Sequence, residues 1–204
     1  SPYTGTIFSG NPLFVDLKQL TEKEWHNILS KTTYEDIVNN NPNKDTNKIA
    51  YSYIYKKQNE ALLEAWNNFK NLNDKKLMKE FDLYKRENDS WLDKDSLYEA
   101  LSIEHGNDYW PLWESDMDKN LFNPKSYEEG IKYGERINEI SKKYSDEIDF
   151  YKFVQFVLSK QNQKTLDYAK KKGIKMIADR QVAFSDRDCW AYQSLFLEGW
   201  CLGC

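Results

Sequence analysis

The stretch Gly173-Ile174-Lys175-Met176-Ile177-Ala178-Asp179 decides the fold class of this chain of 204 residues. Before it, apolar residues recur with helical spacing from about residue 147 to residue 172, and Gly173 stands where a helix C′ glycine belongs. The stretch itself is a short apolar run typical of a strand, and it ends in a carboxylate. A helix, a glycine and a strand in this order predict an α/β fold with a parallel sheet.

Asp179 is the residue of this stretch with a candidate function. In α/β enzymes, catalytic and binding groups gather at the carboxyl ends of the strands, which is the predicted position of this carboxylate. The same carboxylate could instead cap the segment that follows it. The residues alone leave both interpretations open.

Helical patterns fill most of the chain before this unit. Apolar and aromatic residues recur at three- and four-residue spacings over 51–69, 75–86 and 91–105, and a capping-box pattern at Ser126 indicates a further helix. A similar pattern predicts a short helix beginning at Trp25, and the apolar run 13–17 predicts a short strand. Helix far outweighs strand, so these patterns predict an α-rich protein that carries one strand of a parallel sheet.

The composition indicates a folded chain and excludes several classes of partner. The 10 Phe, 14 Tyr and 7 Trp argue against disorder, and a formal net charge of −4 gives no electrostatic reason to bind nucleic acid. No apolar run approaches the ~20 residues that span a bilayer, and the N-terminus lacks the pattern of a signal peptide. Three Cys do not make a disulfide framework, so we expect a reducing, cytoplasmic location.

Aromatic and metal-binding residue types carry weaker signals. Trp110 and Trp113 could stack on sugar rings, but such rings more often anchor a loop on the core. The CxxC pattern at 201–204 lacks the further ligands that zinc needs, and the two histidines show no partner pattern. We therefore predict neither a metal site nor another cofactor.

Several segments are informative through their order and spacing. They are Ser1–Tyr3 (SPY), Gly10–Leu17 (GNPLFVDL), Glu87–Tyr98 (ENDSWLDKDSLY), Phe150–Gln163 (FYKFVQFVLSKQNQ), Gly173–Ala191 (GIKMIADRQVAFSDRDCWA) and Leu202–Cys204 (LGC). Together they resemble the 4-α-glucanotransferases of glycoside hydrolase family 77, also called amylomaltases or disproportionating enzymes. Two positions depart from the family pattern, because Ala178 stands where Gly is common and Ser96 where Tyr is frequent.

The resemblance implies a (β/α)₈ TIM barrel with a large helical insertion, of which this chain would be an N-terminal-half fragment. A barrel loop and a short strand would occupy residues 1–19, and a helical insertion subdomain would occupy residues 20–145. A helix, a barrel strand and an active-site loop would occupy residues 146–204. These three parts would make one incomplete catalytic domain.

The resemblance also implies an enzyme that transfers α-1,4-glucan segments between maltooligosaccharides, or starch and glycogen chains, by a retaining double displacement. The nucleophile and the acid/base would lie beyond Cys204, so the fragment alone would be inactive and its partner would be the remainder of the enzyme. Two substrate-binding positions map onto this sequence. Tyr3 is expected to be a ring platform beside the reacting sugar, and Asp179 is expected to bind that sugar's hydroxyls. The location would be the cytoplasm, or a plastid in a plant or alga.

Two other functions stay open at the level of the sequence. The chain could be a non-catalytic glucan-binding or regulatory homologue of these enzymes. It could also be an unrelated helical interaction module, which only the abundance of helix supports. The extent of the encoding gene beyond Cys204 would separate the fragment from the short homologue.

Overall fold

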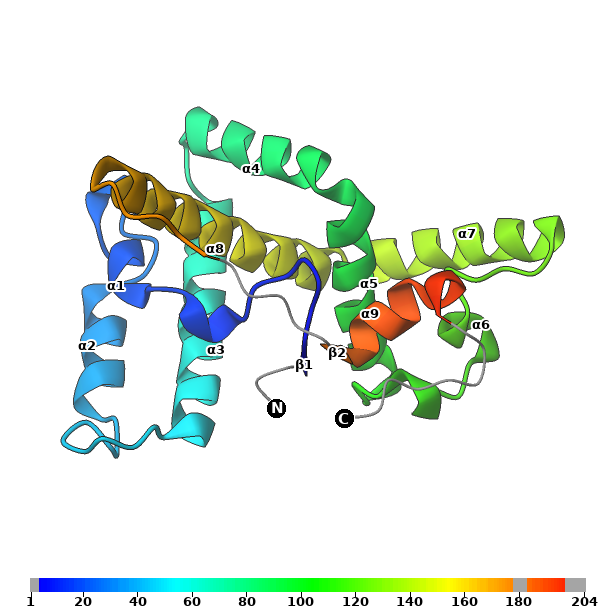
Figure 1. Ribbon diagram of the computed structural model, residues 1–204, viewed down its shortest axis with the longest axis horizontal. Helices are drawn as coiled ribbons and strands as arrows, with labels where there is room; N and C mark the ends of the chain where they lie inside the picture. The colour runs from blue at the N-terminus through cyan, green and yellow to red at the C-terminus, as the bar shows by residue number, and fades with distance from the viewer. Residues whose placement is uncertain (1–3, 178–182, 197–204) are drawn as a thin grey trace. The chain divides into compact units, whose positions relative to one another are not determined.

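The computed structural model describes residues 4–177 and 183–196, and helices dominate them (Figure 1). The elements in chain order, with 3₁₀ helices labelled η, are β1 (Thr4–Gly5), η1 (Pro12–Phe14), α1 (Leu17–Leu20), η2 (Lys23–Trp25), α2 (Lys31–Asn39), α3 (Tyr51–Lys70), α4 (Lys75–Glu87), α5 (Asp89–His105), η3 (Trp110–Leu112), α6 (Asp116–Lys119), α7 (Tyr127–Lys143), α8 (Ser145–Lys171), β2 (Ala183–Phe184), α9 (Asp186–Ala191) and η4 (Gln193–Leu195). The predicted helix-rich span is confirmed. None of the helices among the described residues is both long and apolar enough to cross a membrane.

The chain divides into two compact units. The first unit comprises Ser1–Ser9, Lys85–Lys152 and Met176–Cys204, and the second comprises Gly10–Tyr84 and Phe153–Lys175. The division of the sequence at residues 19 and 145 stays a prediction.

The core of the first unit forms around the middle of α5. Its rings Tyr98, Trp113 and Trp190 contact one another, with centroids 5.3–5.8 Å apart, and all three are nearly inaccessible to water. Both α7 and α9 pack on α5 (Figure 1). The Trp190 Nε1 group donates to the Asp118 carbonyl at 2.8 Å, so this buried ring keeps its hydrogen bond. Trp113 is therefore a core anchor, the more frequent role of such rings.

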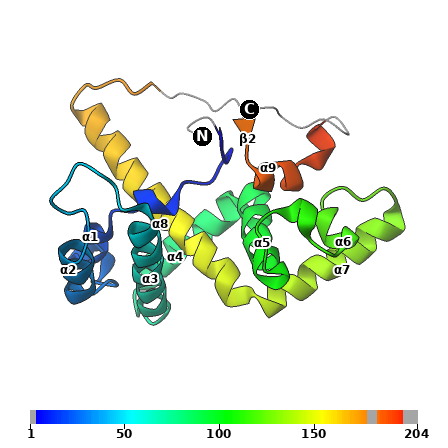
Figure 2. The same ribbon diagram turned by 90° about the horizontal axis from the view of Figure 1, so that it is seen from below.

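The core of the second unit is a cluster of aromatic rings from three helices. Trp66 and Phe69 of α3 contact Phe153 of α8 with centroids 5.3 and 4.8 Å apart, and Phe81 of α4 meets Phe69 edge-on at 5.6 Å. In the same unit α2 lies beside α3 (Figure 2), where the Tyr53 hydroxyl donates to the Ile37 carbonyl at 2.9 Å. Trp66 and Phe69 thus lie on the face of α3 that is buried in this cluster, whereas Tyr51 and Tyr55 at the start of the same helix are exposed.

The strand predicted at residues 13–17 is wrong. Pro12–Phe14 form η1, and Asp16 caps α1 by accepting from the Lys18 N–H at 3.0 Å. The backbone groups that a strand would pair are held by glutamine side chains instead. Gln161 Oε1 accepts from the Asp16 N–H at 2.9 Å, while its Nε2 donates to the Asp16 carbonyl at 3.0 Å. A side-chain amide thus replaces a neighbouring strand as the partner of this loop.

The strand predicted over 174–179 is not formed where the structure can test it. Residues 174–177 have no regular secondary structure, and Ile177 is 95% exposed. Residues 178 and 179 lie outside the described residues. A strand needs a neighbour for its backbone groups, and the described residues place none beside 174–177.

The helix ends test the predicted caps. The Ser126 side chain accepts from the Glu129 N–H at the start of α7, and Gly173, at φ 71°, follows α8, so both predicted helix ends are confirmed. The Glu129 carboxylate accepts from the Lys125 N–H, so the half of the capping box that Glu129 was expected to supply is directed to the preceding residue. The helix predicted from Trp25 is wrong, because Trp25 is the last residue of η2. Helix α2 has no counterpart among the predicted helices.

Candidate functional site

Neither predicted substrate-binding residue falls within the described part of the chain. Tyr3 immediately precedes Thr4, the first described residue, and Asp179 lies in the gap between 177 and 183. The structure therefore leaves their roles as predictions. It does describe the segments that lead away from both residues.

These two segments lie side by side although almost 180 residues separate them. Strand β1 pairs with β2 in parallel, with Thr4 opposite Ala183 and Gly5 opposite Phe184. Figure 1 shows the two strands side by side. Tyr3 is bonded directly to β1, and Asp179 precedes β2 by four residues. Both residues are therefore near the pair in sequence, and their positions in space stay a prediction.

The carboxylate of Asp188 in α9 connects the same two segments. Both of its oxygens accept from the Ile7 N–H at 3.2 Å, two residues after β1. Oδ2 also accepts from the Ser185 hydroxyl at 2.8 Å and from the Ser185 N–H at 3.2 Å, directly after β2. The Ser185 side chain in turn caps α9 by accepting from the Asp188 N–H, which completes a capping box.

Aromatic contacts hold the loop after β1. Phe8 stacks on Trp91 of α5 with centroids 5.9 Å apart, and its ring lies 6.3 Å from that of Tyr192. The Thr6 hydroxyl closes the loop by donating to the Ser9 carbonyl at 2.5 Å. Phe8 remains 54% exposed, so part of its ring is free to contact another molecule.

A buried ionic cluster lies under α9. Arg187 Nη1 donates to the Tyr151 hydroxyl at 2.7 Å, and Nη2 pairs with Glu99. The Tyr151 hydroxyl lies 3.3 Å from Asp95 Oδ2. Burial raises the pKa of Asp95 to about 6, against the opposing pull of the Arg187 guanidinium. Each of these side chains is engaged with another, and among the described residues Arg187 Nε is the one buried side-chain donor that lacks a hydrogen-bond partner. The cluster therefore ties α9 to α5 and α8 through Arg187.

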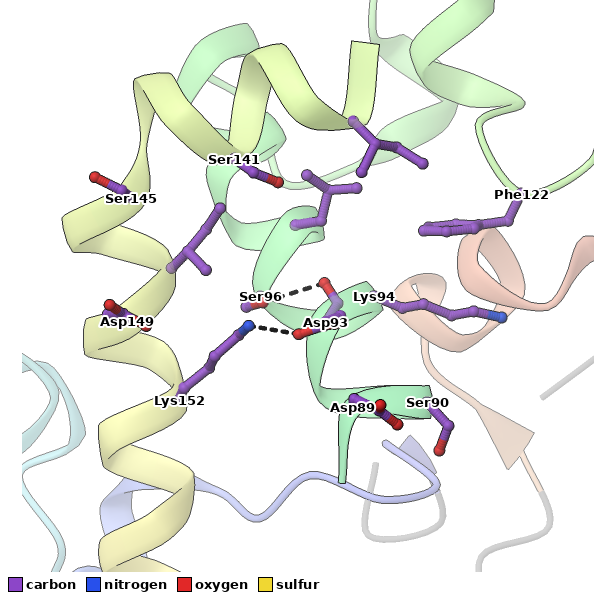
Figure 3. Close-up of a pocket in the computed structure, with 13 residues that line it drawn as sticks. Asp89, Ser90, Asp93, Lys94, Ser96, Phe122, Ser141, Ser145, Asp149 and Lys152 are labelled. Atoms are coloured by element: carbon purple, nitrogen blue, oxygen red, sulfur yellow. Dashed lines mark hydrogen bonds and ion pairs between the residues drawn. The ribbon is translucent and has the colours of Figure 1, made fainter. Parts of the chain in front are cut away.

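A pocket of about 560 Å³ opens among α5, α7 and the start of α8 (Figure 3). The Lys152 ammonium lies 2.5 Å from the Asp93 carboxylate, and the side chain of Ser141 points toward the same space. Such hydroxyl and charged groups could hydrogen-bond a small polar molecule. No signal in the sequence pointed to this pocket, and it contains neither predicted site residue.

The histidines and cysteines carry no metal site among the described residues, since no group of three His, Cys, Asp or Glu there could hold an ion. His26 pairs with Asp74 at 2.6 Å at the surface. His105 stacks on Trp113 and lies 3.0 Å from Asp118, a partner that the sequence pattern did not reveal. The CxxC pattern at 201–204 lies outside the described residues.

Asp188, which links the two segments, is a residue that the sequence patterns did not single out. The available signal was local: Ser185 followed three residues later by an acid resembles a capping box, which predicts the helix start but not the contact with Ile7.

Comparison with known proteins identifies relatives along the entire chain. The model of glycoside hydrolase family 77, described as 4-alpha-glucanotransferase, matches residues 1–204. The 4-alpha-glucanotransferase of Clostridium butyricum is 30% identical over 200 residues, which cover 97% of this chain and 37% of that protein. The one from Aquifex aeolicus is 26% identical, with 96% of this chain and 35% of that protein covered.

A solved structure shows the same fold. The amylomaltase from Streptococcus agalactiae, solved in complex with acarbose, aligns with a TM-score of 0.76 at 22% identity and covers 96% of this chain. The alignment takes in 36% of that chain, so the 204 residues span about a third of the length of the relatives that they match.

Proposed function

The chain belongs to the 4-alpha-glucanotransferase family, and on that premise we propose that it forms part of an enzyme that transfers α-1,4-glucan segments. The donors and acceptors would be maltooligosaccharides, starch or glycogen chains. The observation that carries this proposal is the family match over all 204 residues. The activity is a proposal because the relatives are nearly three times as long.

In the complete enzyme, residues 174–179 would form a strand of a (β/α)₈ barrel, and the short parallel pair β1–β2 would lie among the loops beyond its carboxyl end. The helices of 20–145 would be an insertion. The likeness to the Streptococcus agalactiae amylomaltase supports this arrangement. The carboxyl ends of barrel strands form the substrate-binding face of such folds. Tyr3 and Asp179 would bind the sugar at that face.

The reaction would be a retaining double displacement. One carboxylate attacks the anomeric carbon while a second protonates the leaving glycosidic oxygen. The hydroxyl of an acceptor glucan then gives its proton to the second carboxylate, and its oxygen displaces the first carboxylate from the anomeric carbon. Both carboxylates would be supplied by sequence outside these 204 residues. Asp179 would accept hydrogen bonds from hydroxyls of the bound sugar, and Tyr3 would offer its ring as a platform.

Incubation with maltotriose tests the proposal. The product of the whole gene that encodes these residues should yield glucose together with longer maltooligosaccharides, while the 204-residue chain alone should yield neither. Turnover by the chain alone would contradict the placement of the catalytic carboxylates. Binding of maltotriose without any turnover by the gene product would favour the non-catalytic glucan-binding homologue.

Asp179 offers a sharper test within the complete enzyme. Charge-assisted hydrogen bonds to a substrate are worth about 1.5–3 kcal/mol each, so Asp179→Asn should lower kcat/KM by about 10–100-fold. The melting temperature should change little. A normal kcat/KM with a lowered melting temperature would instead identify Asp179 as a structural cap.

A further inference from the structure

We propose that Asp188 is a positioning residue for the glucan site, because its carboxylate joins the segment after β1 to the segment after β2. The inference rests on the proposed function and on the predicted roles of Tyr3 and Asp179. Asp188 would not touch the substrate. It would act through the two chain segments that lead to the residues that do.

The Asp188 carboxylate accepts hydrogen bonds from both chain segments. On one side the Ile7 N–H donates to both oxygens at 3.2 Å, and on the other the Ser185 hydroxyl and N–H donate to Oδ2 at 2.8 and 3.2 Å. Asp188 is only 1% exposed, so water does not compete for these bonds. Charge-assisted hydrogen bonds of this kind are stronger than neutral ones.

The strand pair needs such a link because it is short. Only two residue pairs align in β1 and β2, Thr4 with Ala183 and Gly5 with Phe184. Two-stranded pairings are at best marginally stable in water even at greater length, and such short pairing does not fix register strongly. The Asp188 carboxylate closes a ring of contacts through Ile7 and Ser185, which limits sliding of β1 along β2.

The consequence for the site follows from chain connectivity. Tyr3 is bonded to the first residue of β1, and Asp179 is four residues before β2. If β1 and β2 slid or separated, the backbone positions to which Tyr3 and Asp179 are connected would therefore move relative to each other. A misplacement of about 1 Å can reduce turnover by about 100-fold, so a residue remote from the sugar can control its orientation.

The test compares three variants in the complete gene product. Asp188→Ala removes the whole link, and Asp188→Asn keeps one oxygen that can accept from the Ile7 N–H. Ser185→Ala is the comparison for helix capping. It removes the capping hydroxyl of α9, which is one of the three donors to the carboxylate, and it leaves the Ile7 and Ser185 N–H groups as donors to Asp188. The readouts are kcat and KM for maltotriose disproportionation, measured well below the melting temperature, and hydrogen exchange of the Ile7 amide.

Asp188→Ala should lower kcat/KM by about 10–100-fold and accelerate exchange at Ile7, with kcat affected more than KM. Asp188→Asn should recover part of both effects. Ser185→Ala keeps two of the three donors to the carboxylate, so it should lower kcat/KM less than Asp188→Ala does, while slow exchange at Ile7 persists. A purely structural role in capping α9 predicts that Ser185→Ala and Asp188→Ala behave alike.

Two results would overturn the inference. If folded Asp188→Ala keeps the wild-type kcat/KM, the link does not position the site. The same conclusion holds if the activity lost by Asp188→Ala only equals the fraction of that variant that is unfolded. The wild-type protein is measured first, because absence of glucan transfer there overturns the proposed function and this inference with it. Normal transfer by both wild type and Asp188→Ala overturns the inference alone.

Discussion

The side-chain amide of Gln155 bonds both backbone groups of Gly10, 145 residues earlier in the chain. Its Oε1 accepts from the Gly10 N–H at 2.8 Å and its Nε2 donates to the Gly10 carbonyl at 3.1 Å. A Cβ at position 10 would lie 3.1 Å from Leu158, so the close approach also favours glycine. The Gln155 amide therefore makes the same pair of hydrogen bonds to the Gly10 backbone that a residue of a neighbouring strand would make.

Gln155→Ala should lower the free energy of unfolding by about 0.5–1.5 kcal/mol, the net contribution of a typical hydrogen bond. The change removes the partner of both Gly10 backbone groups, but Gly10 is exposed, so water can replace the lost amide. Urea unfolding of variant and wild type measures the difference.

Gln163→Ala is the matched control on the same helix. Gln163 is exposed, and its amide donates to Asp167 one turn later at 2.8 Å. Its removal should change the free energy of unfolding by no more than about 0.5 kcal/mol. Equal urea midpoints for the two variants would show that the Gln155 amide does not hold the loop.

Asp118→Ala should be among the most damaging single changes in the first unit. The carboxylate is fully buried and accepts from Arg136 Nε and Nη2, both at 2.9 Å, and its Oδ2 lies 3.0 Å from His105. Removing one partner of a buried ion pair costs about 3–5 kcal/mol because the other charge stays buried. Thermal denaturation should show a drop of about 2–4 °C per kcal/mol.

Asp116→Ala, two residues earlier in α6, is the matched control. It removes one acidic charge without touching the buried contacts of Asp118. Its side chain is 93% exposed and pairs with Lys119 at 3.4 Å. Such surface pairs contribute little, so the melting temperature should stay within about 2 °C of the wild type. Similar drops for both variants would contradict the importance of the buried network.

Local patterns predicted the long helices well because those helices bury one face. The apolar spacing that indicated 51–69 and 75–86 corresponds to α3 and α4, whose rings meet in the second unit. Helix α2 was missed although Tyr34, Ile37 and Val38 recur at helical spacing, because its nine residues carry this pattern over a single turn and none of them is buried. The apolar run at 13–17 was wrong because a short apolar run does not distinguish a strand from a helical turn.

The candidate site depends on contacts that local patterns do not contain. The Ser185–Asp188 spacing predicts a helix cap, but the bond from Ile7 to Asp188 joins residues 181 positions apart. The pairing of β1 with β2 is likewise a property of the folded chain. The resemblance supplied Tyr3 and Asp179 by motif, and their roles stay predictions.

The stability of the protein should carry a specific pH signature from Asp95. Burial raises the pKa of this carboxyl to about 6, above the value near 3.9 expected in the unfolded chain. The folded state therefore binds more protons than the unfolded state between about pH 4 and pH 6. The contribution of Asp95 to stability is full below about pH 4 and is lost as the pH rises through about 6.

Asp95→Asn removes this titration and so isolates it. Relative to wild type, the variant should gain free energy of unfolding as the pH rises from 4 to 7, by at most about 3 kcal/mol for a two-unit shift. Urea unfolding of both proteins at several pH values gives the difference curve. A difference that is flat across this range would show that Asp95 titrates alike in the folded and unfolded states.

One substitution, Gly→Ala, should have opposite effects at two glycines. Gly106 ends α5 at φ 61°, a left-handed conformation that costs an alanine about 1 kcal/mol, so Gly106→Ala should lower the melting temperature. Gly134 lies inside α7, and a Cβ there meets nothing within 4 Å. Gly134→Ala should raise the free energy of unfolding by about 0.5–1 kcal/mol, because alanine loses less backbone entropy on folding. Calorimetry measures the melting temperature of both variants, which carry the same added methyl group. If both melting temperatures shift in the same direction, backbone conformation does not decide the effect of the substitution on stability.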